Sequence, residues 1–322
     1  MDAANTHIDA LIGRIRSSVR EAHTYTVDLP AGIEVKVNQN ESPFDLPAEL
    51  KEAILDRIEG MPWNRYPSEF ADRLRRRIGE ANGVSPEAVL VGNGSNELTY
   101  LLGLALIEPD DPVVLPGPMF SLYEKVARLH DAEVVRVGPR EDLGFDTDGL
   151  VRAVRAHRPP LTVLTTPNNP TGRAMRPGEI RDVVDASEEG FVVVDEAYIQ
   201  FTEYPSAVAL VEYHPQVLVL RTFSKGFGLA GLRVGYMIGR PDVMEELYRA
   251  RLPFMIDPLA EEAACALLEN RELLEDRIRQ LVMSREQLFA ALDRMEGVEP
   301  VPSESNFVIF RTNLDSEVLV EK

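Results

Sequence analysis

Between residues 89 and 239 the chain alternates short runs of apolar, β-branched residues with longer segments of helical periodicity. A run such as FVVVD (191–195) is apolar at four successive positions, which indicates a strand buried on both faces of a sheet. Strands that alternate with helices are typical of a mostly parallel sheet covered by helices on both sides. The pattern therefore predicts an α/β fold. The expected strands are residues 89–92, 112–116, 132–137, 161–166, 191–197, 216–222 and 232–239.

The segments between these strands predict helices. In residues 69–83, Leu74 and Ile78 fall on one apolar face, and Ser68 is the predicted N-cap. Thr147 is predicted to cap a later helix in the same way. Further helices are expected at residues 95–107, 121–129 and 177–187.

After about residue 258 the pattern changes to long charged helices and one apolar run at 306–311, which is predicted to be a strand. This change indicates a second, smaller α/β domain, and a length of 322 residues fits two domains. The last residues have the pattern of a helix that has only begun, so the sequence is expected to stop short of the end of that domain. The predicted divisions are an N-terminal arm at 1–32, a large domain at 33–255 and a small C-terminal domain at 256–322.

Acidic residues outnumber basic ones by 53 to 34, which gives a formal net charge of −19. A nucleic-acid-binding protein needs a basic face, so this balance argues against that class. Lysine is scarce within the basic set, and a lysine inside a motif is therefore informative. The five lysines are Lys36, Lys51, Lys125, Lys225 and Lys322.

A cytoplasmic location is expected. Cys265 is the single cysteine, which fits a reducing compartment. The N-terminal residues form an amphipathic pattern with Asp2 and Asp9 and no continuous apolar run, unlike a secretory signal. No run approaches the roughly 18 apolar residues that span a bilayer. The five histidines have no metal-ligand spacing, so no metal site is predicted.

Two glycine-rich segments are candidate phosphate sites. GFGLAG (226–231) matches the dinucleotide pattern G-x-G-x-x-G, but that motif must open a helix, and here a predicted strand follows. A nicotinamide oxidoreductase is therefore the weaker alternative. GNGSNE (92–97) does follow a strand and open a helix, so the amides of Ser95 and Asn96 can bind an anion. An ordinary turn with Ser95 as N-cap is equally compatible with this segment.

Polar residues also follow three of the predicted strands, at the edge where ligands bind in such sheets. Asn168 and Asn169 lie in TTPNNPTG, and Asp195 ends a buried strand. A buried carboxylate is costly unless a cation meets it. Considered alone, Asp195 would be a helix N-cap and Lys225, eight residues before Arg233, a solvated loop residue.

Together these residues describe a ligand with an anionic group, a ring cation and a carbonyl that an amine can attack. In PNNPTG (167–172), VDEAY (194–198) and SKGFGLAGLRVG (224–235), the chain resembles the fold-type I pyridoxal-phosphate enzymes, the aspartate-aminotransferase superfamily. The resemblance implies the cofactor pyridoxal 5′-phosphate, with Lys225 as its Schiff-base lysine and Asp195 as the partner of its pyridinium nitrogen. It further implies contacts to the phenolate oxygen from Asn169 and Tyr198, to the phosphate from Ser95, Asn96, Ser224 and Arg233, and ring stacking by Phe120.

Within the superfamily, VNQNESPFDLP (37–47) and NRYPS (64–68) resemble the histidinol-phosphate aminotransferases. The resemblance implies a homodimer in which Tyr66 reaches the cofactor phosphate of the neighbouring subunit. It also implies substrate contacts from Tyr25, Asn40 and Asn306.

The implied reaction transfers the amino group of histidinol phosphate to 2-oxoglutarate and yields imidazole-acetol phosphate and glutamate, a step of histidine biosynthesis. In it, the amine of Lys225 moves the substrate proton. An aromatic aminotransferase, a phosphothreonine decarboxylase or a non-catalytic protein that binds the same cofactor would share the cofactor residues, so the sequence leaves these alternatives open.

Overall fold

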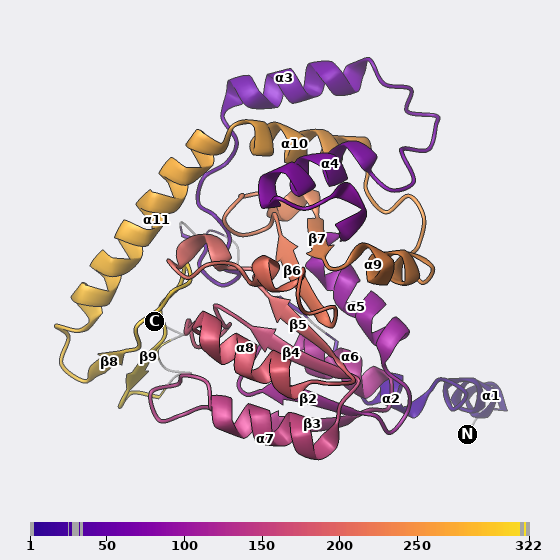
Figure 1. The fold of residues 1–322 in the computed structure, drawn as a ribbon, viewed down its shortest axis with the longest axis vertical. Coiled ribbons are helices and arrows are strands. Elements are labelled where there is room, and N and C mark those ends of the chain that lie inside the picture. Colours follow the sequence, from indigo (N-terminus) through magenta and orange to yellow (C-terminus); the bar gives the residue numbers. More distant parts are fainter. Residues whose placement is uncertain (1–2, 25, 28–31, 33–34, 316–318, 320–322) are drawn as a thin grey trace.

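The computed structural model describes residues 3–24, 26–27, 32, 35–315 and 319. At its centre lies a seven-stranded sheet with the order β1-β7-β6-β5-β4-β2-β3 (Figure 1). The strands from β3 to β6 in this order are parallel, whereas β7 runs antiparallel to both β6 and β1. The prediction of a mostly parallel α/β fold is confirmed. The strands are β1 (Val89–Asn93), β2 (Pro112–Pro116), β3 (Glu133–Val137), β4 (Leu161–Thr165), β5 (Phe191–Asp195), β6 (Val217–Thr222) and β7 (Val234–Ile238).

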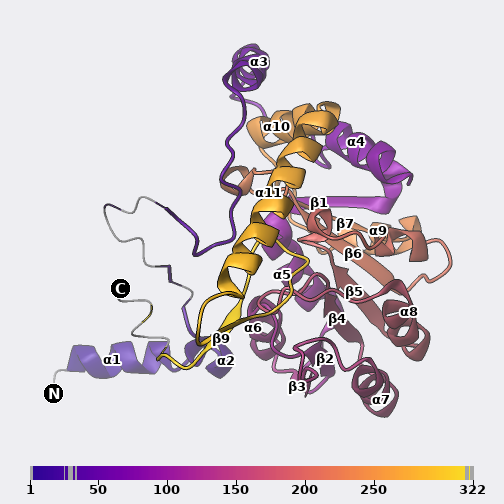
Figure 2. The ribbon, with the colours of Figure 1, turned by 90° about the vertical axis from the view of Figure 1, so that its left-hand side faces the viewer.

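Helices cover both faces of this sheet (Figure 2). Successive residues of a strand point to opposite faces, so each strand contributes to two cores. In β5, Val192 and Val194 join the core beneath α7 and α8, whereas Val193 joins the core beneath α5, α6 and α9. The helices are α4 (Asp72–Asn82), α5 (Gly94–Leu106), α6 (Leu122–Leu129), α7 (Thr147–His157), α8 (Pro177–Ala186) and α9 (Pro241–Tyr248).

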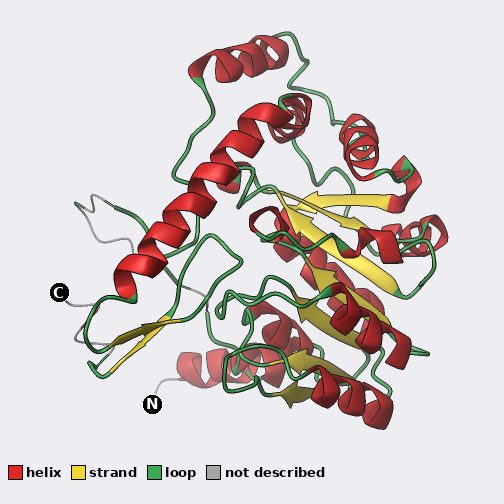
Figure 3. Ribbon diagram, turned by 60° about the vertical axis from the view of Figure 1, so that its left-hand side comes forward, coloured by secondary structure: helices red, strands yellow, loops and turns green. Residues whose placement is uncertain are grey.

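The remaining elements lie outside these two layers. The long helix α11 leads away from α10 to a small two-stranded sheet that lies apart from the large one (Figure 3). The predicted domain boundaries at residues 32 and 255 stay a prediction. These elements are α1 (Ala3–Ile12), α2 (Ser17–Arg20), α3 (Ala48–Glu59), α10 (Pro258–Glu269), α11 (Arg271–Leu292), β8 (Val298–Pro300) and β9 (Phe310–Thr312).

Two predicted N-caps are wrong. Helix α4 begins at Asp72 because Ala71 has a left-handed conformation, with φ of 51°, which interrupts the helical path after Ser68. Helix α7 does begin at Thr147, but its N-cap is Asp146, whose carboxylate accepts a hydrogen bond of 2.9 Å from the amide of Gly149. A carboxylate one position earlier thus replaces the predicted hydroxyl cap.

The strand predicted at 306–311 is also wrong over most of its length, because only its last two residues belong to β9. The side-chain amide of Asn306 instead donates to the backbone oxygen of Asn40 at 3.0 Å. Among the described residues, the structure contains no helix that is both long and apolar enough to cross a membrane.

Candidate active site

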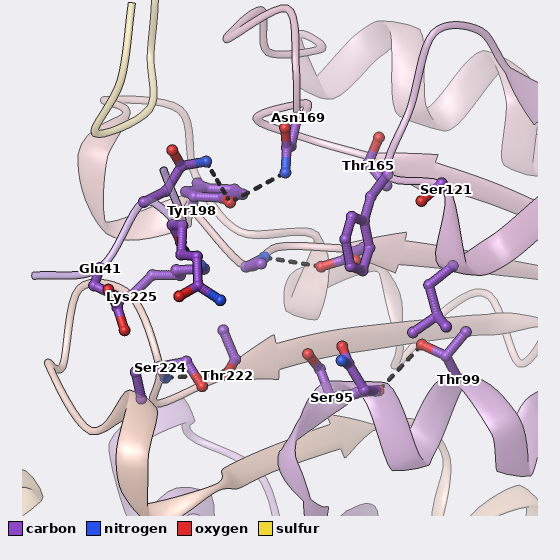
Figure 4. A pocket seen from close by; sticks show the side chains of 18 of the residues that line it. Glu41, Ser95, Thr99, Ser121, Thr165, Asn169, Tyr198, Thr222, Ser224 and Lys225 are labelled. Atoms are coloured by element: carbon purple, nitrogen blue, oxygen red, sulfur yellow. Dashed lines mark hydrogen bonds between the residues drawn. The ribbon is translucent and has the colours of Figure 1, made fainter. Parts of the chain in front are cut away.

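A cavity of about 800 Å³ lies at the carboxyl ends of the parallel strands (Figure 4). Helix α5, the ends of β4, β5 and β6, and the segment before α3 all contribute to its walls. Ligands of open α/β sheets bind beyond this edge, at the carboxyl ends of the strands. The predicted site residues that line the cavity are Asn40, Ser95, Asn96, Phe120, Asn169, Asp195, Tyr198, Ser224, Lys225 and Arg233.

Asp195 is a buried carboxylate at the end of β5. Its Oδ2 accepts a hydrogen bond of 2.6 Å from the hydroxyl of Tyr123, and its Oδ1 accepts one of 3.0 Å from the amide of Ala197. Burial raises the pKa of Asp195 to about 6, although both hydrogen bonds oppose this shift. Among the described side chains, the partner of this carboxylate is a tyrosine hydroxyl and not a cation.

Lys225 follows β6 and presents its amine to the same cavity. Its Nζ donates to the backbone oxygen of Gln39 at 2.6 Å and lies 5.9 Å from the centroid of the Tyr198 ring. Burial lowers the pKa of Lys225 to about 8; Glu41 opposes this shift, and the positive charge of Arg233 adds to it. A substantial fraction of this amine is therefore neutral, and so nucleophilic, near pH 8.

Tyr198 places a hydroxyl between two amides (Figure 4). Its oxygen accepts hydrogen bonds from the side-chain amides of Asn40, at 3.3 Å, and Asn169, at 3.5 Å. Burial raises the pKa of Tyr198 to about 12, so the hydroxyl keeps its proton. Because the oxygen already accepts two bonds, the proton is available to donate into the cavity.

The other end of the cavity has the features of an anion site. Helix α5 begins at Gly94, so Ser95 lies within its first turn. The alternative interpretation required Ser95 to be the N-cap and is therefore wrong. The unpaired amides of a first turn attract anions. Opposite them, the guanidinium of Arg233 contacts the Ser224 hydroxyl at 3.3 Å. A Cβ on Gly94 would lie 2.3 Å from this guanidinium, so only glycine permits the close approach.

Comparison with known proteins identifies the family. The family model described as aminotransferase class I and II matches residues 33–322. The chain belongs to this family. The histidinol-phosphate aminotransferase of Chlorobaculum tepidum is 40% identical over 304 residues, which cover 94% of this chain and 87% of that protein.

Solved structures of similar fold agree with this assignment. The histidinol-phosphate aminotransferase of Sinorhizobium meliloti, in complex with pyridoxal-5′-phosphate, has a TM-score of 0.80 and 26% identity, and the match covers 87% of this chain and 76% of that one. The L-threonine-O-3-phosphate decarboxylase of Porphyromonas gingivalis has a TM-score of 0.74 and 26% identity, covering 84% and 80%. The predicted enzyme class, a pyridoxal-phosphate-dependent aminotransferase, is confirmed.

The cavity of this aminotransferase fits that cofactor by the chemistry of its residues. Asp195 offers a buried negative charge, Lys225 an amine of lowered pKa, and Tyr198 a hydroxyl proton. Within the described ranges, no group of three or more His, Cys, Asp or Glu side chains is arranged to hold a metal ion. The GFGLAG loop continues into a short 3-10 turn, Ala230–Leu232, and then into β7, so the helix that a dinucleotide motif requires does not follow it.

Two predicted residues, Tyr66 and Asn306, do not line the cavity. Tyr66 is 81% exposed and stacks on Phe254, with ring centroids 4.5 Å apart. Asn306 contacts the backbone of Asn40, which does line the cavity. Tyr25 lies outside the described residues.

Sequence reasoning missed four residues that shape the cavity: Gln39, Glu41, Thr99 and Tyr123. Gln39 contacts Lys225 through its backbone oxygen, which no side-chain pattern reveals. Glu41 lies in the segment that resembles the histidinol-phosphate aminotransferases, so its position was a usable signal. Thr99 and Tyr123 fall on the buried faces of their helices, where a hydroxyl without an obvious partner was the only clue.

Proposed function

We propose that this aminotransferase transfers the amino group of histidinol phosphate to 2-oxoglutarate, giving imidazole-acetol phosphate and glutamate. One observation carries the proposal: Asp195, Lys225 and the start of α5 with Arg233 meet in a single cavity. The substrate is inferred from the relatives, because a histidinol-phosphate aminotransferase is 40% identical over 94% of the chain.

The residues of the cavity would hold pyridoxal 5′-phosphate at its distinct chemical groups. Lys225 would bind it covalently, Asp195 would face its ring nitrogen, and Asn169 and Tyr198 its phenolate oxygen. The bound cofactor supplies a ring that accepts electrons from the substrate carbon. Ser95, Asn96, Ser224 and Arg233 would bind the phosphate, and Phe120 would stack on the ring.

Lys225 is the group that moves the proton. With pyridoxal 5′-phosphate bound, a free Lys225 amine would accept a proton from the substrate Cα, because burial keeps a large share of it neutral near pH 8. The same Nζ would then hold that proton and be the group that gives it back. Gln39, whose backbone oxygen is 2.6 Å from this Nζ, orients the amine.

The proposed assembly is a homodimer in which Tyr66 contributes to the neighbouring subunit's site. Trp63 and Tyr66 are 80% and 81% exposed. Leu252, which lies two residues before the stacking partner Phe254, is 64% exposed. Large apolar side chains gathered on a surface are typical of an interface. Substrate contacts from Tyr25, Asn40 and Asn306, and the cytoplasmic location, stay predictions.

A phosphothreonine decarboxylase is the second candidate, because a solved enzyme of that activity has a similar fold. Its identity to this chain is 26%, against 40% for the histidinol-phosphate aminotransferase, so transamination is favoured. The cofactor residues do not separate the two reactions, and an assay must.

Purified protein loaded with pyridoxal 5′-phosphate is incubated with histidinol phosphate and 2-oxoglutarate, and glutamate is measured. We expect glutamate in proportion to histidinol phosphate, and its loss in Lys225→Ala. A parallel incubation with O-phosphothreonine measures carbon dioxide. Carbon dioxide without glutamate would contradict the proposed reaction and support the second candidate.

A further inference from the structure

Asp195 has a protein partner that the proposed chemistry does not use. The hydroxyl of Tyr123 donates to its Oδ2 at 2.6 Å, a length typical of a hydrogen bond to an ionised carboxylate. The other oxygen is held by the amide of Ala197 at 3.0 Å. The carboxylate is therefore fixed at both oxygens before any ligand arrives.

Tyr123 is itself held rigidly. It lies in the first turn of α6, is 5% exposed, and packs in the core that α5 and α6 form on the sheet. Asp195 reaches this core because it alternates with Val194 along β5 and so shares the face of Val193. Core packing thus determines where the Tyr123 hydroxyl points.

A second hydroxyl lies behind the first. Thr99 on α5 is buried, and its hydroxyl donates to the Ser95 backbone oxygen at 3.1 Å (Figure 4). Because the Tyr123 proton goes to Asp195, Thr99 is also the donor in its contact with the Tyr123 oxygen, so its one proton is shared between the two acceptors. Ser95 belongs to the first turn of α5, at the anion end of the cavity. The hydroxyls of Tyr123 and Thr99 therefore connect the carboxylate end of the cavity to its anion end.

We propose that Tyr123, supported by Thr99, is a positioning residue that keeps the Asp195 carboxylate ionised and oriented toward the cofactor ring nitrogen. The inference rests on the proposed cofactor. Burial would otherwise favour a neutral carboxyl, which cannot stabilise a cationic ring nitrogen. Tyr123 counteracts this effect of burial because it donates a hydrogen bond to the carboxylate and keeps its own proton.

The charges around this pair support the assignment. Burial, followed by the negative charge of Asp195, raises the pKa of Tyr123 well above its usual value, so Tyr123 stays a donor. Burial raises the pKa of Asp195 to about 6, with Glu196 adding to the rise and Tyr123 opposing it. Across the cavity the titratable groups are Glu41, Lys125, Tyr198, Lys225 and Arg233. The neighbouring strand ends carry Thr165 and Thr222, which do not titrate.

The test measures cofactor binding by apoenzyme between pH 5 and 9 in an absorbance titration with pyridoxal 5′-phosphate. Without the Tyr123 donor, the midpoint of the pH dependence should rise by about one unit in Tyr123→Phe. The affinity at pH 5.5, relative to that at pH 8, should fall by about fivefold to tenfold. The cofactor's own titration contributes equally to the pH dependence of affinity in all variants. Once that contribution is subtracted, Asp195→Asn should show a flat pH dependence.

The control is Tyr248→Phe, which removes a tyrosine hydroxyl that packs beside the same core and donates to the Val89 backbone oxygen at 3.0 Å. Its pH midpoint should match the wild type. A Tyr123→Phe profile that coincides with that of the control would overturn the inference.

Thr99→Val provides an independent variant if Tyr123→Phe fails to fold, because it removes only the second hydroxyl. We expect a smaller rise of the midpoint, and an unchanged midpoint would then overturn the inference. Wild-type apoenzyme that binds no cofactor at any pH would instead overturn the proposed function, together with the inference that rests on it.

Discussion

At the scale of single residues, burial shifts the pKa values of two groups of this cavity in opposite directions. It raises the pKa of the Asp195 carboxyl and lowers that of the Lys225 amine, so each is less charged than it would be in water. Titratable groups whose pKa values are shifted by their environments in this way are typical of catalytic sites. Both shifts carry a cost in stability when the cofactor is absent.

Asp195→Asn should therefore stabilise the apoenzyme at pH 8. The folded pKa of about 6 lies above the usual aspartate value of 3.8, so folded protein binds more protons, and stability is lost as pH rises from about 4 through 6. Removing the charge should recover up to about 3 kcal/mol at pH 8 and nothing near pH 4. Urea unfolding at the two pH values measures this; an equal effect at both would contradict the account.

Lys225 should react with pyridoxal 5′-phosphate faster as pH rises, with a midpoint near pH 8, because only the neutral amine attacks a carbonyl. Stopped-flow absorbance of apoenzyme mixed with cofactor gives this profile. A midpoint above pH 10 would show that the amine is not desolvated.

At the scale of elements, the site depends on where strands and helices end. The residues after β4, β5 and β6 meet because these strands are parallel neighbours, which makes Asn169, Asp195 and Lys225 predictable from the sequence. The Tyr123 bond was not predictable, because it depends on how α6 packs against β5. The cap of α7 was missed because Asp146 and Thr147 are both good caps in adjacent positions.

The start of α5 gives a prediction at this scale. Gly94 has φ of +75°, and an added Cβ would lie 2.3 Å from the Arg233 guanidinium. Gly94→Ala should cost about 1–3 kcal/mol of stability and should weaken binding of pyridoxal 5′-phosphate more than that of pyridoxal, which lacks the phosphate. The matched control is Gly178→Ala on α8, where a Cβ meets nothing within 4 Å. Equal losses for the two ligands would place the anion elsewhere.

At the scale of the whole molecule, exposed aromatic residues indicate where a second subunit would bind. Trp63 and Tyr66 are largely exposed, and Tyr66 stacks only on Phe254 of its own chain among the aromatic contacts that the described residues make. In the proposed dimer this surface lies against the neighbour. The motif around Tyr66 predicts this arrangement, but a single chain does not reveal the partner's position.

Mixed dimers test the proposed assembly. Tyr66→Phe should weaken cofactor retention, and Lys225→Ala should abolish activity. A dimer that contains one subunit of each variant has one site with both Lys225 and Tyr66 intact. A purified mixed dimer should therefore have about half of the wild-type activity, and an equimolar mixture of freely exchanging subunits about a quarter. Light scattering establishes the subunit number. Mixtures no more active than the sum of the separate variants would contradict a shared site.

The central claim is that Lys225, rather than another lysine, binds pyridoxal 5′-phosphate. Among the five lysines, Lys125 also lines the cavity and provides an internal control. Borohydride reduction of the loaded enzyme, followed by peptide mass spectrometry, identifies the lysine that carries the cofactor. The account predicts a phosphopyridoxyl group on Lys225 alone. Its attachment to Lys125, or to no lysine, would contradict the account.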